Sequence, residues 1–176
     1  CYKCTQLTSL PLWVNIEYVE CSNCYSLSSL PNWENVTVVI CYENSLLTEL
    51  PLWSKVSFVN CADCSSLIKL QNWNTVYTVV FSRCKLITSI PKWERVDTVN
   101  CSGCELLTEL PNWQHVRSLN CCDCVNLKSI PNKGVGYGAL FGYKNQELPK
   151  VTFNYLGQFD HLENIDDWCI VDEEAG

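Results

Sequence analysis

The hydrophobic positions of this chain recur every twenty residues over residues 1–132. Two aliphatic residues, two cysteines, two leucines or isoleucines, a proline and a tryptophan return at the same places in successive segments, giving V-x-x-V-x-C-x-x-C-x-x-L-x-x-L-P-x-W-x-x. The tryptophans are Trp13, Trp33, Trp53, Trp73, Trp93 and Trp113. A short, regular repeat of this kind predicts a solenoid, because stacked turns bury a continuous core that one turn could not bury alone.

Within each repeat the pattern predicts one short β-strand. Residues 37–41 (TVVIC) alternate in the way that points every second side chain inward. The Leu-Pro step that follows ends strand pairing, since proline cannot donate to a ladder. Twenty residues leave the opposite, convex side of a turn room for extended or 3₁₀ chain. We therefore expect a mainly β solenoid with parallel strands ~4.8 Å apart and a column of indoles beneath the convex layer.

The repeat resembles the leucine-rich repeat, L-x-x-L-x-L-x-x-(N/C)-x-L, with its first cysteine at the third leucine and its second at the asparagine/cysteine position. The version with C-x-x-C and L-P-x-W is similar to leucine-rich repeat proteins of giant DNA viruses of the mimivirus kind, some of which carry an F-box. The resemblance covers residues 1–132, as six complete turns with partial ends. It implies a leucine-rich-repeat horseshoe that binds proteins, in a host cytoplasm or in a virus particle.

The last segment, 133–176, departs from the repeat. Leu162, Ile165 and Trp168 restore three of its columns, which predicts one irregular turn, one divergent turn and a closing cap. At the other end, residue 1 is a cysteine inside a repeat and the chain has no methionine, which predicts a piece of a longer or processed chain. Its N-terminal edge would lack a lid and be open to a partner or to self-association.

The fourteen cysteines admit a metal-binding, a redox and a structural interpretation. Both cysteine columns fall on inward positions, and their two substitutes, Phe81 and Asn44, suit a core better than a metal site. The histidines His115 and His161 are not spaced as ligands. We therefore predict reduced structural thiols with no metal and no cofactor, and expect the second column to bond backbone groups of the neighbouring turn. Cys122 follows an inward cysteine and is expected to face outward as a reactive thiol.

Charge and motif content exclude several functions. The net charge of −7 argues against nucleic acid or an anionic membrane as partner. No apolar run is long enough to predict a membrane span. No phosphate loop and no nucleophile–base arrangement is visible, so we predict that the chain is not an enzyme. A ladder of reduced thiols favours a reducing, cytoplasmic compartment.

The outward strand residues are the candidate binding site, because they line the concave face of such a solenoid. In the first half of the repeats they are aromatic and aliphatic with a rim of carboxylates, which would suit a partner with an apolar anchor and a basic rim. In the second half they are small and polar. Strand propensity alone, or burial under a flanking segment, would also explain the pattern. The candidate residues are Tyr18, Glu20, Val38, Ile40, Tyr42, Glu43, Phe58, Asp63 and Val80.

The sequence thus predicts a non-enzymatic protein–protein interaction module that acts through its concave strand face. Three alternatives stay open at this point. The chain could be the substrate-recognition part of an F-box-type ubiquitin ligase, although no F-box lies in these 176 residues. It could be a structural component of a virus particle, or a metal- or redox-active protein.

Overall fold

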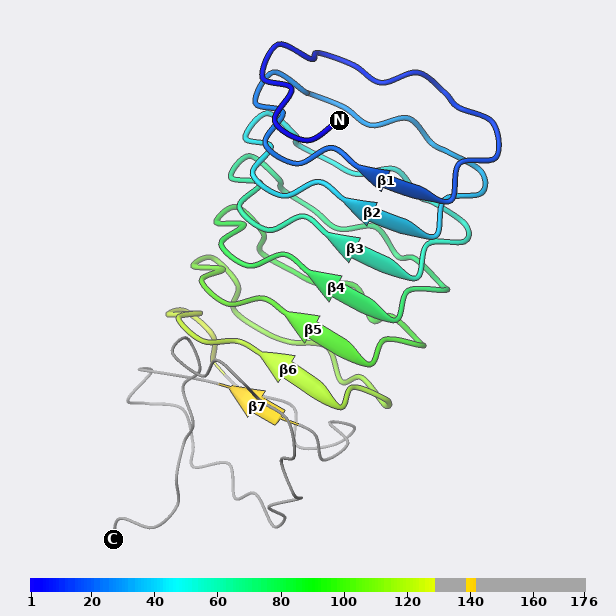
Figure 1. Ribbon diagram of the computed structural model, residues 1–176. Coiled ribbons are helices and arrows are strands. Elements are labelled where there is room, and N and C mark those ends of the chain that lie inside the picture. Colours follow the sequence, from blue (N-terminus) through cyan, green and yellow to red (C-terminus); the bar gives the residue numbers. More distant parts are fainter. Residues whose placement is uncertain (129–138, 142–176) are drawn as a thin grey trace, which may run out of the picture.

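The computed structural model describes residues 1–128 and 139–141. These residues form a stack of turns with one short strand in each (Figure 1). The strands form one parallel sheet in chain order. They are β1 (Tyr18–Glu20), β2 (Val38–Ile40), β3 (Phe58–Asn60), β4 (Thr78–Val80), β5 (Thr98–Asn100), β6 (Ser118–Asn120) and β7 (Ala139–Phe141). The predicted mainly β solenoid with one short parallel strand per twenty-residue turn is confirmed.

The register of the sheet follows the sequence period. Val39 of β2 pairs with Val59 of β3, and every pairing from β1 to β6 joins residues twenty apart. The last step is longer by one residue, because Leu119 of β6 pairs with Leu140 of β7. The remainder of the predicted cap, including Leu162, Ile165 and Trp168, lies outside the described residues.

A tight corner follows each strand from β1 to β6, and another lies at residues 1–4, between the two cysteine positions of the repeat. One residue of each corner has a positive φ of 56–69°. This conformation is unfavourable for residues with a Cβ atom and is readily adopted by glycine. Only one of these positions holds glycine, Gly103. The set is Lys3, Asn23, Glu43, Asp63, Arg83, Gly103 and Asp123. The chain turns away from the sheet at this corner, so the strain recurs with each turn.

The side opposite the sheet is built from extended chain and bends, and the described residues contain no helix, as the short repeat predicted. Here each Trp backbone N–H donates to the carbonyl oxygen two residues earlier, as from Trp33 to Pro31 at 3.1 Å. This narrow bend takes the place of the helix for which twenty residues leave no room.

The tryptophans form the predicted column inside the turns. Neighbouring indole centroids lie 6.0–6.4 Å apart with interplanar angles of 5–12°. From Trp33 to Trp113, each indole Nε1 donates to a carbonyl oxygen of the preceding turn at 2.9–3.3 Å, as from Trp53 to Pro31. The indoles of Trp33 to Trp113 are buried, whereas Trp13 is 40% exposed. The column therefore supplies large apolar burial and also satisfies its own buried donors.

Candidate functional site

The outward face of the sheet is the surface that the sequence predicted as the binding site. In each strand from β1 to β6 the middle residue is buried and points into the core, whereas its two neighbours are half-buried or exposed. Parallel pairing in register places each outward side chain beside its equivalent in the next turn. The close spacing of the strands explains why these side chains are half-buried although they face outward.

The structure brings the nine predicted residues onto this face and the corner next to it. Val38 lies beside Phe58, so the apolar side chains adjoin across β2 and β3, whereas Val80 of β4 is separated from Ile40 by the polar Asn60. Tyr18 is the most open of the strand residues, at 54% exposure. None of the nine is buried in the core, so the sheet offers all of them to solvent or to a partner.

A tyrosine cluster lies at the N-terminal end of the face. The ring centroids of Tyr2 and Tyr42 are 6.5 Å apart, and the Tyr18 hydroxyl donates to Glu20 Oε2 at 3.2 Å. The pKa of Tyr42 is raised by interaction with the Tyr2 hydroxyl, by loss of solvation and by the carboxylates of Glu20 and Glu43. Loss of solvation and Glu20 also raise the pKa of Tyr18. The two tyrosines are therefore neutral donors that lie beside carboxylates.

Sequence reasoning missed Tyr2. It occupies the same repeat position as Tyr42, two turns earlier, and the small, fully buried Ser22 stands at that position in the turn between them. A serine there lets two large rings approach across the intervening turn. The shared repeat position of Tyr2 and Tyr42 is visible in the sequence, but the predicted site begins with Tyr18, at the first complete strand.

The acidic residues of this face differ in their partners. The Asp63 carboxylate accepts two hydrogen bonds from Arg83, from Nε and Nη2, each at 2.6 Å. At the opposite end of the strands, in the position just before each begins, Arg117 pairs with Asp97 and donates to the Tyr77 hydroxyl at 2.5 Å. Within the described residues no ion pair includes Glu20 or Glu43. Carboxylates outside these ion pairs thus lie beside the tyrosines of the first turns, and Asp123, in the corner after β6, is another.

The second cysteine column forms a ladder of hydrogen bonds between turns. Each thiol donates to the carbonyl oxygen of the residue 23 positions earlier, at 2.9–3.3 Å. The donors are Cys24, Cys64, Cys84, Cys104 and Cys124. Asn44 fills the remaining place: its Nδ2 donates to the Cys21 carbonyl, again 23 residues earlier, at 2.9 Å. The predicted bonding of this column to backbone groups of the neighbouring turn is confirmed.

The described cysteines are thirteen free thiols, of which only Cys1 and Cys4 are exposed. The prediction that Cys122 faces outward is wrong, because its side chain is only 5% exposed. Alternation of inward and outward side chains holds within a strand, whereas residue 122 begins the corner, where Ser22 and Ser82 at the same repeat position are buried too. Burial raises the pKa of the Cys21 thiol to about 12, so this thiol stays protonated at neutral pH.

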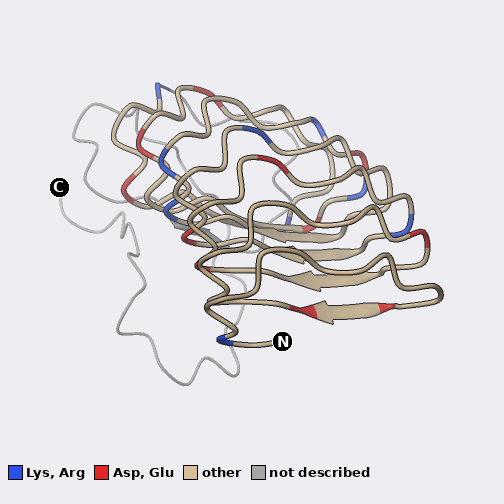
Figure 2. Ribbon diagram, turned by 90° about the horizontal axis from the view of Figure 1, so that it is seen from above, with Lys and Arg blue, Asp and Glu red and all other residues tan. Residues whose placement is uncertain are grey.

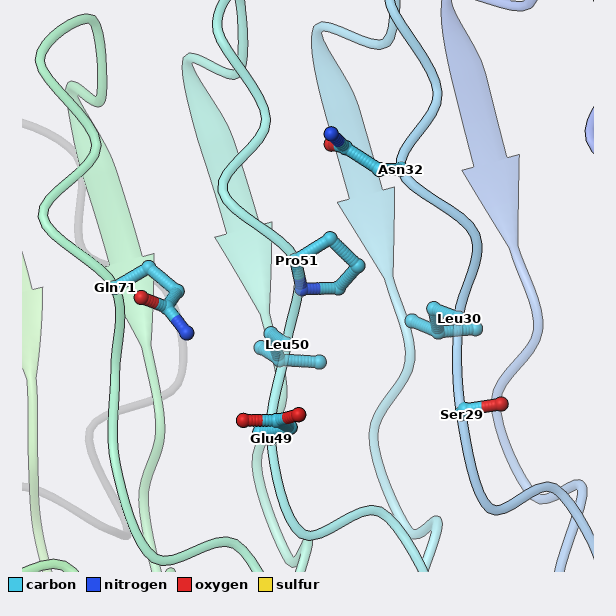
Figure 3. Close-up of a pocket in the computed structure, with 7 residues that line it drawn as sticks. All are labelled: Ser29, Leu30, Asn32, Glu49, Leu50, Pro51 and Gln71. Atoms are coloured by element: carbon cyan, nitrogen blue, oxygen red, sulfur yellow. The ribbon is translucent and has the colours of Figure 1, made fainter.

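The described part of the chain contains no group of three or more histidine, cysteine, aspartate or glutamate side chains placed to hold a metal ion. A depression of about 280 Å³ lies opposite the sheet and is lined by Ser29, Leu30, Asn32, Glu49, Leu50, Pro51 and Gln71 (Figure 3). Its single ionisable residue, Glu49, pairs with Lys69 at 3.1 Å. An equivalent depression sixty residues later includes Leu110 and Pro111, so this hollow is a product of the Leu-Pro repeat.

Comparison with known proteins yields little. No family model matches the chain. A stretch of 26 residues is 65% identical to N-(5-amino-5-carboxypentanoyl)-L-cysteinyl-D-valine synthase of Penicillium rubens, and an equal match is found in Penicillium chrysogenum. The match covers 15% of this chain and 1% of the synthase, little more than one repeat. No helix in the described residues has the length and apolar character needed to cross a membrane.

Proposed function

We propose that this chain is a non-enzymatic interaction module that binds a protein partner through the outward face of its sheet. The observation that carries the proposal is the apolar band of half-exposed side chains on β2, β3 and β4, formed by Val38, Ile40, Phe58 and Val80, in which Val38 lies directly beside Phe58. Contiguous apolar surface of this kind on a solenoid is typical of a partner-binding face.

The later turns serve as an internal comparison. In β5 and β6 the same outward positions hold Thr98, Asn100, Ser118 and Asn120, while the inward positions stay apolar. The two halves share one register and one core, so the fold does not require apolar side chains at the outward positions. Strand propensity would act equally on both halves and does not explain why only the first is apolar.

The test is a binding experiment with the intact chain and two matched double variants. The immobilised chain captures a partner from cell extract, the partner is identified by mass spectrometry, and its affinity is then measured with purified protein. Tyr42→Ala with Phe58→Ala should weaken this binding at least tenfold, since central aromatic side chains dominate interface energies. Thr98→Ala with Ser118→Ala, on the polar half, should leave it unchanged. Equal binding by both double variants would refute the proposal.

A second arrangement, packing against copies of the same chain, is favoured by the exposed surface of the first turn. Val14 is 85% exposed, and the equivalent positions of the next two turns hold polar Glu34 and Ser54. Trp13, which stacks on Trp33, is also exposed there, at 40%. Analytical ultracentrifugation of the chain and of a Val14→Glu variant tests this arrangement. A monomer at all concentrations for the unmodified chain would exclude it.

A further inference from the structure

The tyrosine cluster and its carboxylates lie together at one end of the proposed binding face. Glu20 is the common neighbour: it accepts a hydrogen bond from Tyr18 and acts electrostatically on Tyr42. Tyr42 in turn lies against Tyr2, and Glu43 follows Tyr42 in the chain. Three aromatic rings and two carboxylates thus border one area of the surface, on β1 and the neighbouring corners.

The charges on this face are unevenly matched. Asp63 and Asp97 each have an arginine partner, whereas Glu17, Glu20 and Glu43 take part in none of the ion pairs of the described residues. Figure 2 shows the same bias, with acidic (red) segments at both ends of the strand nearest to the N-terminus. Carboxylates outside the ion pairs therefore lie beside the aromatic rings at this end of the face.

The rings of this cluster already accept a cation from the chain itself. The Lys3 ammonium lies 5.0 Å from the centroid of the Tyr2 ring. It forms no ion pair with Glu20 or Glu43 among the described residues, so the carboxylates stay available while the ring face attracts positive charge. The Cys1 ammonium nearby donates to the Glu20 backbone carbonyl at 2.9 Å and leaves the carboxylate free as well.

We infer that Tyr2, Tyr18 and Tyr42, together with Glu20 and Glu43, form a subsite for a lysine or arginine side chain of the partner. The rings would cover the aliphatic stem and the faces of the charged group, and the carboxylates would accept its N–H donors. The inference rests on the proposed function, since it assigns one part of that binding face. The apolar band across β2 to β4 would then contact the residues of the partner next to this side chain.

Two small probes that differ in charge alone test the subsite directly. N-acetyl-arginine methylamide and its uncharged analogue N-acetyl-citrulline methylamide are titrated into the chain, and the ring signals of labelled tyrosine are followed by NMR at low salt. The arginine probe should shift the signals of Tyr18 and Tyr42 and bind roughly five- to thirtyfold more tightly than citrulline. The difference should shrink in 0.5 M salt, because the subsite is open to solvent.

Paired variants locate the effect. Glu20→Gln with Glu43→Gln should remove most of the preference for arginine, whereas Glu94→Gln with Glu109→Gln, on exposed residues outside the sheet, should preserve it. Both double variants change the net charge equally, so a general electrostatic effect would lower the preference in both. Equal binding of the two probes, or equal loss in the two double variants, would overturn the inference.

Failure of this inference can be told apart from failure of the proposed function. If a captured partner depends on Tyr42 and Phe58 but not on Glu20 and Glu43, the binding face stands and the cation subsite is wrong. If the arginine probe binds and no partner depends on Phe58, the subsite stands and the proposed face is wrong.

Discussion

Replacing Asn44 by alanine should destabilise the chain by about 3–4 kcal/mol, because this side chain satisfies three buried backbone groups. Its Oδ1 accepts from the Cys24 backbone N–H at 2.8 Å, and its Nδ2 donates to the carbonyl oxygens of Cys21 and Cys41 at 2.9 and 3.0 Å. At ~1 kcal/mol for each bond the loss is ~3 kcal/mol, and the groups left unsatisfied and the small cavity add to it.

Asn44→Cys is the informative comparison, since cysteine occupies this position in the other turns. Its thiol would still donate to the Cys21 carbonyl, and the Cys24 N–H would fall back on the longer local bond seen from Cys64 to Cys61, at 3.4 Å. We expect this variant to cost only about 1 kcal/mol, roughly one hydrogen bond. The alanine and cysteine variants should therefore differ by about 2 kcal/mol.

Urea unfolding followed by tryptophan fluorescence measures both changes, because the indole column reports directly on the stacking of the turns. With a slope of ~2 kcal/mol per molar urea, the alanine variant should unfold at ~1.5–2 M lower urea and the cysteine variant at ~0.5 M lower. Asn32→Ala, at an exposed asparagine opposite the sheet, is the control and should shift the midpoint little. Equal midpoints for Asn44→Ala and Asn44→Cys would refute the reasoning that the amide acts through its hydrogen bonds.

Three further predictions concern stability. Trp53→Ala should cost about 3–5 kcal/mol by urea unfolding, since it opens a gap in the indole column; a cost similar to that of Phe58→Ala would contradict the core assignment. Glu43→Gly should stabilise by about 0.5–1 kcal/mol, because φ is +57° there, whereas Glu109→Gly, where φ is not positive, should destabilise by a similar amount. Burial raises the pKa of Cys121 from 9.0 to about 12, so the folded thiol stays protonated while the unfolded one ionises. The contribution of this thiol to the free energy of unfolding is fully present below pH 9 and is lost as the pH rises towards 12, with about 1.4 kcal/mol lost at pH 10. The free energy of unfolding of Cys121→Ala should therefore depend less on pH between 8 and 10 than that of the unmodified chain.

The fold could be read from the sequence because one rule accounts for residues 1–128. A period of twenty fixes the register of every strand from β1 to β6, and inward positions that are apolar in almost every turn, with Asn44 as an exception, identify the core. The absence of helix opposite the sheet followed from length alone. The 21-residue step to β7 could not be foreseen, because the repeat pattern fades after residue 132.

The site was predictable only in part, since its details depend on the corner rather than on the strand. Cys122 was misplaced because strand alternation does not extend into a turn of positive φ. The pairing of Asp63 with Arg83 depends on two long side chains at equivalent positions adopting matching rotamers, which a column of sequence letters does not specify. Tyr2 could have been found by extending the tyrosine column one turn towards the N-terminus.

The donors of the indole column and of the second cysteine column point one way along the solenoid. Indole Nε1 atoms reach the carbonyl 22 residues earlier, and thiols the carbonyl 23 residues earlier, so each turn docks on acceptors that were translated before it. A ribosome that adds ~5–20 residues per second delivers one turn every few seconds, long after the previous turn has had time to close. The indole column and the thiol ladder can therefore form turn by turn during synthesis, whereas the corner N–H groups bond to the turn that follows, as from Cys41 to the Asn60 carbonyl at 2.8 Å.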